Sequence, residues 1–339
     1  MSVDARVVVA PRGVDAQLQV SSGTTVVLMG PNGAGKSTLL EAIAGIVAMD
    51  DGHISVGGVS FASGSRQVLA RQRGVGLVTQ DDELFPTMSV RENVAFGPRA
   101  QGANRKAAHA QADAWLEKMG ILELAHRSPQ TLSGGQARRV AIARALASEP
   151  TVLLLDEPLA RLDIEQASHI RRLLATVLQG MTAIVSTHDA LDAHTLATEV
   201  AVMEAGRIVE SGRPEHVLVT PRTAFGARMA GRQLLTGVMR KGALVVDSGA
   251  TVPVVSGPGQ GVRAAIAVRP TLVSVNSKQP GPAGALISEA VTAIEPRGDY
   301  VRVYGQSVAA DIDVTEAATI ALGQHVTFGL PAGLEAYAL

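Results

Sequence analysis

A glycine-rich loop set between an apolar run and a helical pattern constrains the fold of this chain more than any other feature. The loop reads GPNGAGKST from Gly30 to Thr38 and fits the pattern G-x-x-x-x-G-K-[ST]. TTVVLMG (24–30) precedes it as a β-branched apolar run, and KSTLLEAIAGI (36–46) follows with helical spacing. Glycines in such a strand–loop–helix unit expose backbone N–H groups to phosphate at the positive end of a helix dipole. The loop therefore predicts an α/β domain that binds a nucleotide.

The residues of this loop are the predicted nucleotide contacts. Lys36 supplies a positive charge for the β- and γ-phosphates, and the Ser37 hydroxyl is a predicted ligand of Mg²⁺. The other expected contacts are Gly30, Pro31, Asn32, Gly33, Ala34, Gly35 and Thr38. An ordinary glycine-rich turn is the alternative, and the strand and helix on either side of the loop argue against it.

A second apolar run ends in two carboxylates. TVLLLDEP (151–158) has the continuous apolar pattern of a buried parallel strand, and such strands carry functional residues at their C-terminal ends. We predict that Asp156 holds Mg²⁺ directly or through water. Glu157, the next residue, is a candidate general base for a water molecule. The alternative is a carboxylate pair that only ends a strand.

Another glycine-containing turn, LSGGQ (132–136), opens directly into a helical pattern. Its free N–H groups and helix dipole form a further cradle for phosphate. The motifs LSGGQ and VLLLDE (152–157), together with the P-loop, resemble in order and spacing those of the ATPase subunits of ABC transporters. In that family the LSGGQ segment of one subunit closes over the nucleotide held by the P-loop of another.

The resemblance implies a homodimer with two composite sites for ATP and Mg²⁺, arranged head to tail. It implies that Ser133, Gly134, Gly135 and Gln136 contact nucleotide bound to the partner subunit. The second phosphate cradle would thus serve the neighbouring chain.

Further positions match the family one by one. Gln80 resembles the Q-loop glutamine, which implies a catalytic role, contact with Mg²⁺ and a place beside the transmembrane partner. His188, at the end of the apolar run TAIVSTHD (182–189), resembles the switch histidine that contacts the γ-phosphate. Asp163 resembles the D-loop aspartate, although Arg161 stands where a smaller residue is commoner.

One departure concerns the adenine base. The family usually stacks an aromatic ring on it, but VVVAPRGVDAQLQV (7–20) contains no aromatic residue. We therefore expect Val14 or a neighbour to pack against the base. Because stacking contributes on the order of 1–3 kcal/mol in nucleic-acid analogues, discrimination between ATP and GTP should be weak.

The patterning predicts two domains. Strand-like and helix-like segments alternate through an ATP-binding domain at 1–225, with a helical subdomain at about 89–150. Short strand candidates separated by Gly, Pro and Ser predict a small all-β domain at 231–339. This second domain resembles the OB-like (TOBE) accessory domain of importer ATPases. The stretch SVNSKQPGPAGAL (274–286) within it predicts either a loop or a break between two β units.

The composition excludes several classes of protein. The chain has 30 basic and 31 acidic residues among 339, so its charge gives no case for binding nucleic acid. Cysteine is absent, which excludes disulfides and thiolate metal sites. No apolar run reaches the length of a membrane span or of a signal-peptide core. We expect a soluble subunit that a partner holds at the cytoplasmic face of the membrane. The basic run RQVLARQR (66–73) is expected to be a solvated face.

Resemblance also suggests what the transporter carries. The segments DDELFPTMSVRENVAFGPR (81–99) and AVTAIEPRGDYVRV (290–303) are similar to those of bacterial importers, most of all the molybdate type. Importers of sulfate, ferric iron, polyamines or sugars share the architecture. A permease, and through it a solute-binding protein, would be the partners. Candidates for contacts to an oxyanion in the second domain are Arg263, Arg269, Arg297 and Arg302. The alternative, which we favour for each of them, is a solvated surface arginine.

Two other hypotheses remain. DNA-repair and chromosome-organising ATPases share the motifs, but they separate them by long coiled coils that this sequence lacks; translation-type relatives normally carry two ATPase units in one chain. A protein of another class, an oxyanion-binding regulatory protein acting through residues 231–339, is the second alternative.

Overall fold

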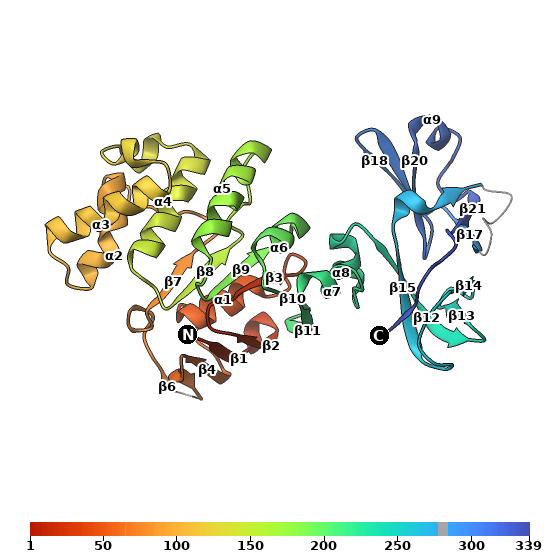
Figure 1. The fold of residues 1–339 in the computed structure, drawn as a ribbon, viewed down its shortest axis with the longest axis horizontal. Helices are drawn as coiled ribbons and strands as arrows, with labels where there is room; N and C mark the ends of the chain where they lie inside the picture. The colour runs from red at the N-terminus through yellow and green to blue at the C-terminus, as the bar shows by residue number, and fades with distance from the viewer. Residues whose placement is uncertain (65, 277–283) are drawn as a thin grey trace. The chain divides into compact units, whose positions relative to one another are not determined.

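A six-stranded sheet, parallel except for one edge strand, forms the centre of residues 1–214 (Figure 1). The computed structural model describes residues 1–64, 66–276 and 284–339. The strand order is β11-β10-β3-β9-β8-β7, and only β11 runs antiparallel to its neighbour. These strands are β3 (Thr25–Met29), β7 (Val75–Val78), β8 (Val152–Asp156), β9 (Ala183–Thr187), β10 (Glu199–Glu204) and β11 (Arg207–Gly212). The strands predicted from the three apolar runs are confirmed as β3, β8 and β9.

This topology gathers the predicted site at one edge of the sheet. Parallel strands end at the same edge, and β3, β9 and β8 are neighbours there. The P-loop follows β3 and leads into α1 (Lys36–Ala44). Glu157 follows β8, and His188 follows β9. Three segments far apart in the sequence therefore meet.

A second, antiparallel sheet lies in the same unit, with the order β2-β1-β4-β5-β6. Its strands are β1 (Val3–Val9), β2 (Val14–Val20), β4 (Asp51–Val56), β5 (Val59–Ser63) and β6 (Arg66–Gln67). Buried and exposed residues alternate strictly along β2, which is the pattern of a strand with one solvated face.

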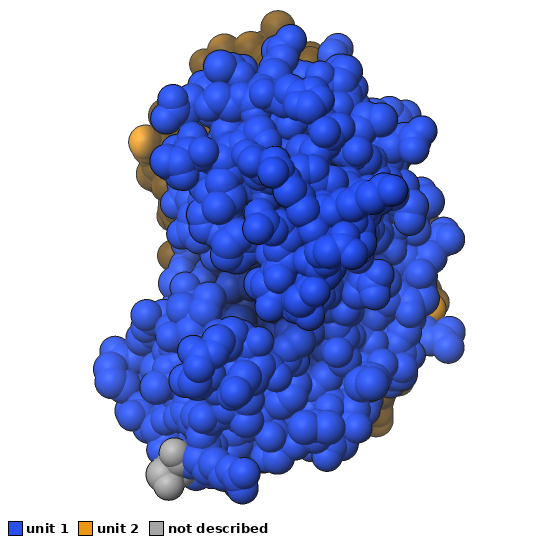
Figure 2. Space-filling view, turned by 90° about the vertical axis from the view of Figure 1, so that its left-hand side faces the viewer, with its two compact units in different colours: residues 1–214 blue, residues 215–339 orange. Residues whose placement is uncertain are grey.

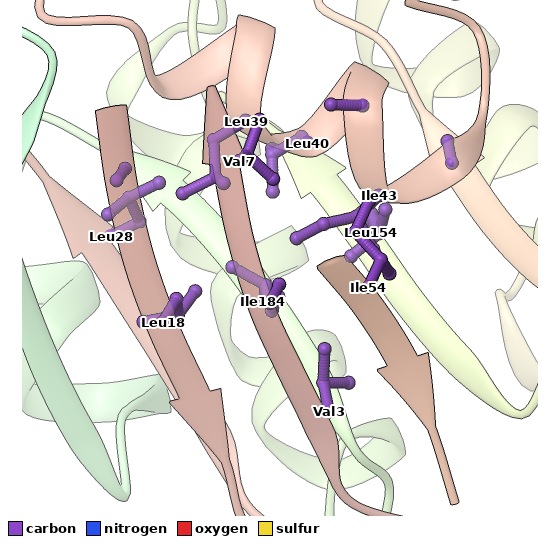
Figure 3. Close-up of a cluster of buried hydrophobic side chains, with 14 of the residues drawn as sticks. Val3, Val7, Leu18, Leu28, Leu39, Leu40, Ile43, Ile54, Leu154 and Ile184 are labelled. Carbon is purple, nitrogen blue, oxygen red and sulfur yellow. The ribbon is translucent and has the colours of Figure 1, made fainter. Parts of the chain in front are cut away.

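One apolar core joins the two sheets and α1 (Figure 3). Its buried members include Val3, Val7, Leu18, Leu28, Leu39, Leu40, Ile43, Ile54, Leu154 and Ile184. Leu39, Leu40 and Ile43 anchor α1 in this core. Replacing a fully buried leucine such as Leu39 by alanine costs about 2–5 kcal/mol. The helix that carries the end of the P-loop is thus fixed by packing.

The predicted helical subdomain contains α2 (Val90–Ala100), α3 (Arg105–Lys118) and α4 (Gly134–Ala147). Ser89 and Glu92 form a capping box that starts α2, and this pairing lowers the pKa of Glu92. Two further helices, α5 (Ile164–Val177) and α6 (Ala190–Leu196), follow β8 and β9.

The predicted solvated face at 66–73 is wrong for Arg73. Its side chain is buried, and Nη1 donates to the carbonyls of Ala42 and Ile43 at 2.8 and 2.9 Å. These carbonyls belong to the last turn of α1, and the Ala42 carbonyl also accepts from the Gly45 amide at 3.1 Å, just past the end of the helix. Arg73 therefore caps the C-terminal end of the helix that begins at the P-loop.

Residues 215–339 form a mainly β unit with its own apolar core; the two units have different colours in Figure 2. Its sheets have the orders β14-β13-β12-β15-β22, β16-β21-β17 and β18-β19-β20. The strands are β12 (Gln233–Arg240), β13 (Ala243–Val246), β14 (Thr251–Pro253), β15 (Arg263–Val268), β16 (Ser274–Val275), β17 (Leu286–Ala290), β18 (Ala293–Arg297), β19 (Tyr300–Tyr304), β20 (Ala309–Asp313), β21 (His325–Gly329) and β22 (Tyr337–Ala338). The predicted α/β domain followed by a small β domain is confirmed as the fold class.

Three short helices complete this unit: α7 (Pro214–Val217), α8 (Ala224–Met229) and α9 (Val314–Ala317). The predicted boundary at 225–231 falls on α8 and just after it. Most of the predicted loop at 274–286, namely 277–283, lies outside the described residues. Among the helices that the structure describes, none has the length and apolar character needed to span a bilayer.

Candidate nucleotide-binding site

The P-loop is held in a shape that only glycine permits at two of its positions. A Cβ atom on Gly30 would lie 2.2 Å from the Met203 carbonyl oxygen. Gly35 has a φ of +102°, and a Cβ there would lie 2.7 Å from Val14 Cγ2. The Gly206 amide donates to the Ala34 carbonyl at 3.0 Å and ties the loop to the β10–β11 turn. Contacts within the chain therefore fix the shape of the loop.

Lys36 is buried beneath this loop. Its Nζ donates to the carbonyls of Gly30 and Pro31 at 2.8 and 3.2 Å, and it lies 3.9 Å from Glu157 Oε1. Burial lowers the pKa of Lys36, while the negative charges of Glu157 and Asp156 act in the opposite direction. The ammonium group of Lys36 thus lies against the carbonyls of its own loop, next to the predicted carboxylates of Asp156 and Glu157.

Glu157 stands between two of the predicted site residues. Its Oε1 lies 3.9 Å from Lys36 Nζ and 3.7 Å from His188 Nδ1. The backbone of Glu157 has a φ of +46°, which turns the chain sharply at the end of β8. The Glu157 side chain is 16% exposed and that of His188 60% exposed, and both line a cavity of about 310 Å³. The structure brings Lys36, Glu157 and His188 together.

A buried ionic network supports the segment that carries His188. Arg171 donates to Asp192 Oδ1 at 2.6 Å and to Asp189 Oδ2 at 2.9 Å. Thr187 Oγ1 donates to the other oxygen of Asp192 at 2.6 Å. Burial raises the pKa of Asp192, although its two hydrogen-bond donors oppose that rise. The turn from β9 into α6 is therefore fixed on both sides of the histidine.

Gln80 lies in an irregular segment that α4 holds in place. Arg138 Nη1 donates to the Thr79 carbonyl at 2.8 Å, and Nη2 donates to the Gln80 carbonyl at 2.6 Å. Arg138 Nε lies 3.1 Å from Asp82 Oδ1, an ion pair without an aligned hydrogen bond. Burial lowers the pKa of Arg138 and raises that of Asp82. The Gln80 side chain is exposed and has no hydrogen bond to any described residue.

The LSGGQ segment begins α4. Ser133 and Gln136 form a capping box, in which the Ser133 amide donates to Gln136 Oε1 at 3.0 Å. A Cβ on Gly135 would lie 2.5 Å from Gln166 Oε1, whereas a Cβ on Gly134 would meet nothing within 4 Å. Within the described residues these side chains make no hydrogen bond to the P-loop of their own chain. Packing inside the subunit thus explains Gly135 but not Gly134.

Asp163 and Arg161 lie on the segment between Glu157 and α5. Asp163 caps α5, because its Oδ1 accepts from the Gln166 amide at 2.8 Å. Arg161 has a φ of +63° and pairs with Asp81 at 2.6 Å, both side chains being largely exposed. The unusual arginine therefore joins this segment to the Gln80 segment.

The residues beside the P-loop fit a magnesium ion that takes a few ligands from the protein and the others from a nucleotide and water. The Ser37 hydroxyl is exposed at the first turn of α1, and one oxygen of Asp156 accepts no hydrogen bond from a described residue. In the described part of the chain no group of three or more His, Cys, Asp or Glu side chains could hold a metal alone. Mg²⁺ typically takes one or two protein ligands together with substrate phosphates and water.

Most of the arginines predicted to meet an anion in residues 215–339 already have carboxylate partners. Arg263 pairs with Asp247, and Arg302 donates twice to Asp311 at 2.6 and 2.8 Å. Arg297 pairs with Glu295 at 2.8 Å. For Arg269 the structure records no such partner among the residues it describes. A bound oxyanion would have to compete with three carboxylates for the other arginines.

Two features of the site were not predicted from the sequence: the contacts of Arg12 and those of Ser186. Arg12 Nη1 donates to Thr38 Oγ1 at 3.3 Å and to Glu41 Oε2 at 2.7 Å. Ser186 contacts both Asp156 and Glu157. A serine inside the apolar run AIVST was the available signal for Ser186, whereas no local pattern marks Arg12.

Comparison with known proteins agrees with this site. A family model described as "ABC transporter" matches residues 14–160. The molybdenum import ATP-binding protein ModC of Mycobacterium tuberculosis is 42% identical, over 96% of this chain and 94% of that protein. The Fe(3+) ions import ATP-binding protein FbpC of Streptomyces coelicolor is 39% identical, over 87% of this chain and 83% of that protein.

Solved structures show the same relationship over about three fifths of this chain. A dimeric ATP-binding cassette in a post-hydrolysis state, bound to ADP and phosphate, has 27% identity and a TM-score of 0.56, covering 62% of this chain and 98% of that one. CbiO1 from Clostridium perfringens, part of an ABC transporter complex, has 30% identity and a TM-score of 0.57, covering 63% and 89%. With import ATP-binding relatives aligned over nearly its whole length, the chain belongs to the ABC transporter family, as an ATPase of the importer type.

Proposed function

We propose that this ABC ATPase drives a molybdate importer, working as a head-to-tail homodimer on the cytoplasmic face of the membrane. The observation that carries the catalytic part is the position of Glu157, with its carboxylate within 4 Å of both Lys36 and His188. The substrate is ATP, and Mg²⁺ accompanies it.

Phosphate binding falls to the P-loop and Lys36. The backbone N–H groups of the loop after Pro31 would donate to the phosphates, and Lys36 would exchange its bonds to the Gly30 and Pro31 carbonyls for phosphate oxygens. Ser37 and Asp156 would hold Mg²⁺, which would neutralise charge that develops on the phosphates. Gln80, on the segment fixed by Arg138, would be a further ligand of this ion.

Hydrolysis depends on a proton acceptor beside the γ-phosphate. Glu157 Oε1 takes a proton from the attacking water, and Lys36, 3.9 Å from that oxygen, helps to orient the carboxylate. His188, 3.7 Å from the same oxygen, donates to the γ-phosphate or to the water. The network of Arg171 and Asp192 keeps the histidine segment in place.

The partner subunit completes each site with its LSGGQ segment. Ser133 and Gly135 would meet the γ-phosphate across the interface, with Gly134 and Gln136 beside them. Gly134 supports this arrangement, since a Cβ there would meet no described residue of its own subunit within 4 Å, which leaves room for another molecule. Asp163, at the start of α5, would lie at the same interface between the two subunits.

Coupling to transport would pass through the Gln80 segment, which faces solvent between the sheet and the helical subdomain. We assign that surface to the permease, and the permease in turn receives solute from a binding protein. ATP-driven closure of the dimer would move the Gln80 segment together with α4, because Arg138 links them.

Molybdate is our choice of cargo because the ModC relative aligns over more of both chains, at higher identity, than the FbpC relative. Ferric iron is the second candidate, because the FbpC relative also aligns over most of both chains. In proteoliposomes containing the chain and its permease, a molybdate-loaded binding protein should stimulate ATP hydrolysis, and a ferric-loaded one should not. The reverse pattern would assign the chain to ferric import.

The second domain offers a separate test of oxyanion binding. Calorimetric titration of the full chain with molybdate, tungstate, sulfate and phosphate should show micromolar binding of the first two if Arg269 and its neighbours form a regulatory site. If the titration shows no heat of binding, the second domain does not act as an oxyanion-binding regulatory site. The assignment as an ATPase would be unaffected.

A further inference from the structure

Ser186 is a buried hydroxyl in a strand that is otherwise apolar up to that point. Ala183, Ile184 and Val185 precede it on β9, and Ser186 itself is 0% exposed. Its position in the sheet is directly opposite Asp156 on β8. Burying a hydroxyl costs free energy unless it is hydrogen-bonded, so the partners of Ser186 show what the residue does.

Both partners belong to the nucleotide-binding site. Ser186 Oγ donates to Asp156 Oδ1 at 2.5 Å and accepts from the Glu157 amide at 2.9 Å. A hydroxyl has a single proton to donate, and the Ser186 hydroxyl donates it in the hydrogen bond to Asp156. The second oxygen of Asp156 accepts no hydrogen bond from the described residues. Ser186 therefore occupies one oxygen of the carboxylate and leaves the other for a ligand.

The same hydroxyl also touches the turn that presents Glu157. The Glu157 amide is shared between Ser186 Oγ at 2.9 Å and the Ser186 carbonyl at 3.2 Å. Because the carbonyl remains in any variant, removing the hydroxyl keeps a backbone link to Glu157. The Asp156 contact is the part that a substitution of Ser186 removes outright.

We propose that Ser186 is a positioning residue for the Mg²⁺ and ATP site: it fixes which oxygen of Asp156 faces the metal. The inference rests on the proposed function, since it requires that Asp156 serve Mg²⁺. Groups that hydrogen-bond a metal-ligating carboxylate orient it, and their loss typically weakens metal affinity about 10–100-fold. Ser186 meets this description through its contact with Asp156.

The test separates nucleotide binding from its dependence on Mg²⁺. ATP binding to the full chain is measured by calorimetry, first in EDTA and then across a Mg²⁺ titration, for wild type, Ser186→Ala and Ser186→Cys. In EDTA the three dissociation constants should agree within about twofold, while the Mg²⁺ midpoint rises about tenfold in Ser186→Ala. Ser186→Cys keeps a weaker donor of similar size and should fall between them.

A matched control removes another buried hydroxyl near β9. Thr182, 4% exposed, accepts from the Gly23 amide at 2.9 Å. Thr182→Val should leave the Mg²⁺ midpoint unchanged. Thermal melting of each variant checks that it is folded. If Ser186→Ala is not folded, the Mg²⁺ midpoint of Ser186→Cys is compared with that of the wild type.

Asp156→Asn provides the second arm. In that background Ser186→Ala should have no further effect on the Mg²⁺ dependence. A shift that persists there overturns the proposal, as does an unchanged midpoint in Ser186→Ala or an equal loss of affinity with and without Mg²⁺. A wild-type chain that fails to bind ATP overturns the proposed function and this inference together, whereas normal wild-type binding with an unchanged midpoint overturns this inference alone.

Discussion

At the scale of single residues, Glu157 is positioned by its backbone as well as by its neighbours. The +46° φ places its carboxylate beside Lys36 and His188. Glu157→Gln keeps the size of the side chain but removes the proton acceptor. ATP binding should persist, while hydrolysis slows about 10²–10⁴-fold. Turnover close to that of the wild type, measured by phosphate release, would exclude Glu157 as the general base.

Lys36 makes a prediction about protons. Because burial lowers the pKa of the nucleotide-free lysine, the side chain loses its proton at a lower pH than an exposed lysine does. Phosphate binding favours the charged form, so ATP binding at alkaline pH should take up protons. Calorimetry in buffers of different ionisation enthalpy measures this uptake, and Lys36→Met should abolish it. Equal proton uptake in Lys36→Met would place the titrating group elsewhere.

The side chain expected at the adenine base is Val14 or a neighbour. Val14 itself is 2% exposed and packs against Gly35. We therefore expect its neighbour Arg12 to meet the base. Arg12 is about half exposed and reaches Thr38 and Glu41. A planar guanidinium can stack on any purine. Arg12→Ala should therefore weaken ATP and GTP binding alike, each about tenfold.

The control for Arg12 is Arg6→Ala, an exposed arginine paired with Asp15 on the neighbouring strand. Fluorescence titration with both nucleotides should find it unchanged. A loss confined to ATP in Arg12→Ala would point to base-specific hydrogen bonds in place of stacking.

At the scale of elements, α4 and the Gln80 segment are joined by arginines that bind backbone carbonyls. Arg138 reaches Thr79 and Gln80, while Arg144 donates to Glu83 and Asp82 at 2.8 and 3.1 Å. Arg138→Gln should destabilise the chain by about 1–3 kcal/mol. It should also speed amide exchange at 79–83 and lower the maximal rate of hydrolysis, with ATP affinity preserved.

Arg105→Gln, on the exposed side of α3, is the matched variant and should leave exchange and hydrolysis as they are. If Arg138→Gln weakened ATP affinity as much as it slowed hydrolysis, the arginine would act on the P-loop and not on the Gln80 segment.

Elements with continuous apolar runs could be predicted from the sequence, because buried parallel strands need no polar residue. β3, β8 and β9 are examples, and the motifs at their ends located the P-loop, Glu157 and His188. The strict alternation of β2 was a usable signal for the antiparallel sheet that our prediction omitted. Arg73, Arg138 and Arg12 could not be predicted, since each binds groups distant in the chain whose approach only the tertiary fold determines.

At the scale of the whole molecule, one chain contains one P-loop and one LSGGQ segment, and the proposed composite site needs two chains. Each unit of the chain has its own apolar core, so neither needs a partner for its packing. The proposed composite site gives the partner its part in catalysis, and within the described residues the LSGGQ side chains make no hydrogen bond to the P-loop of their own subunit.

The absence of cysteine makes a direct test of this arrangement available. Asn32 in the P-loop and Thr131, directly before the LSGGQ segment, are both exposed. Asn32→Cys and Thr131→Cys chains are mixed with ATP and Mg²⁺ and treated with a short bismaleimide. We predict a covalent dimer containing one chain of each kind, and none when either variant is treated alone. ATP binding without a mixed covalent dimer would contradict the composite site.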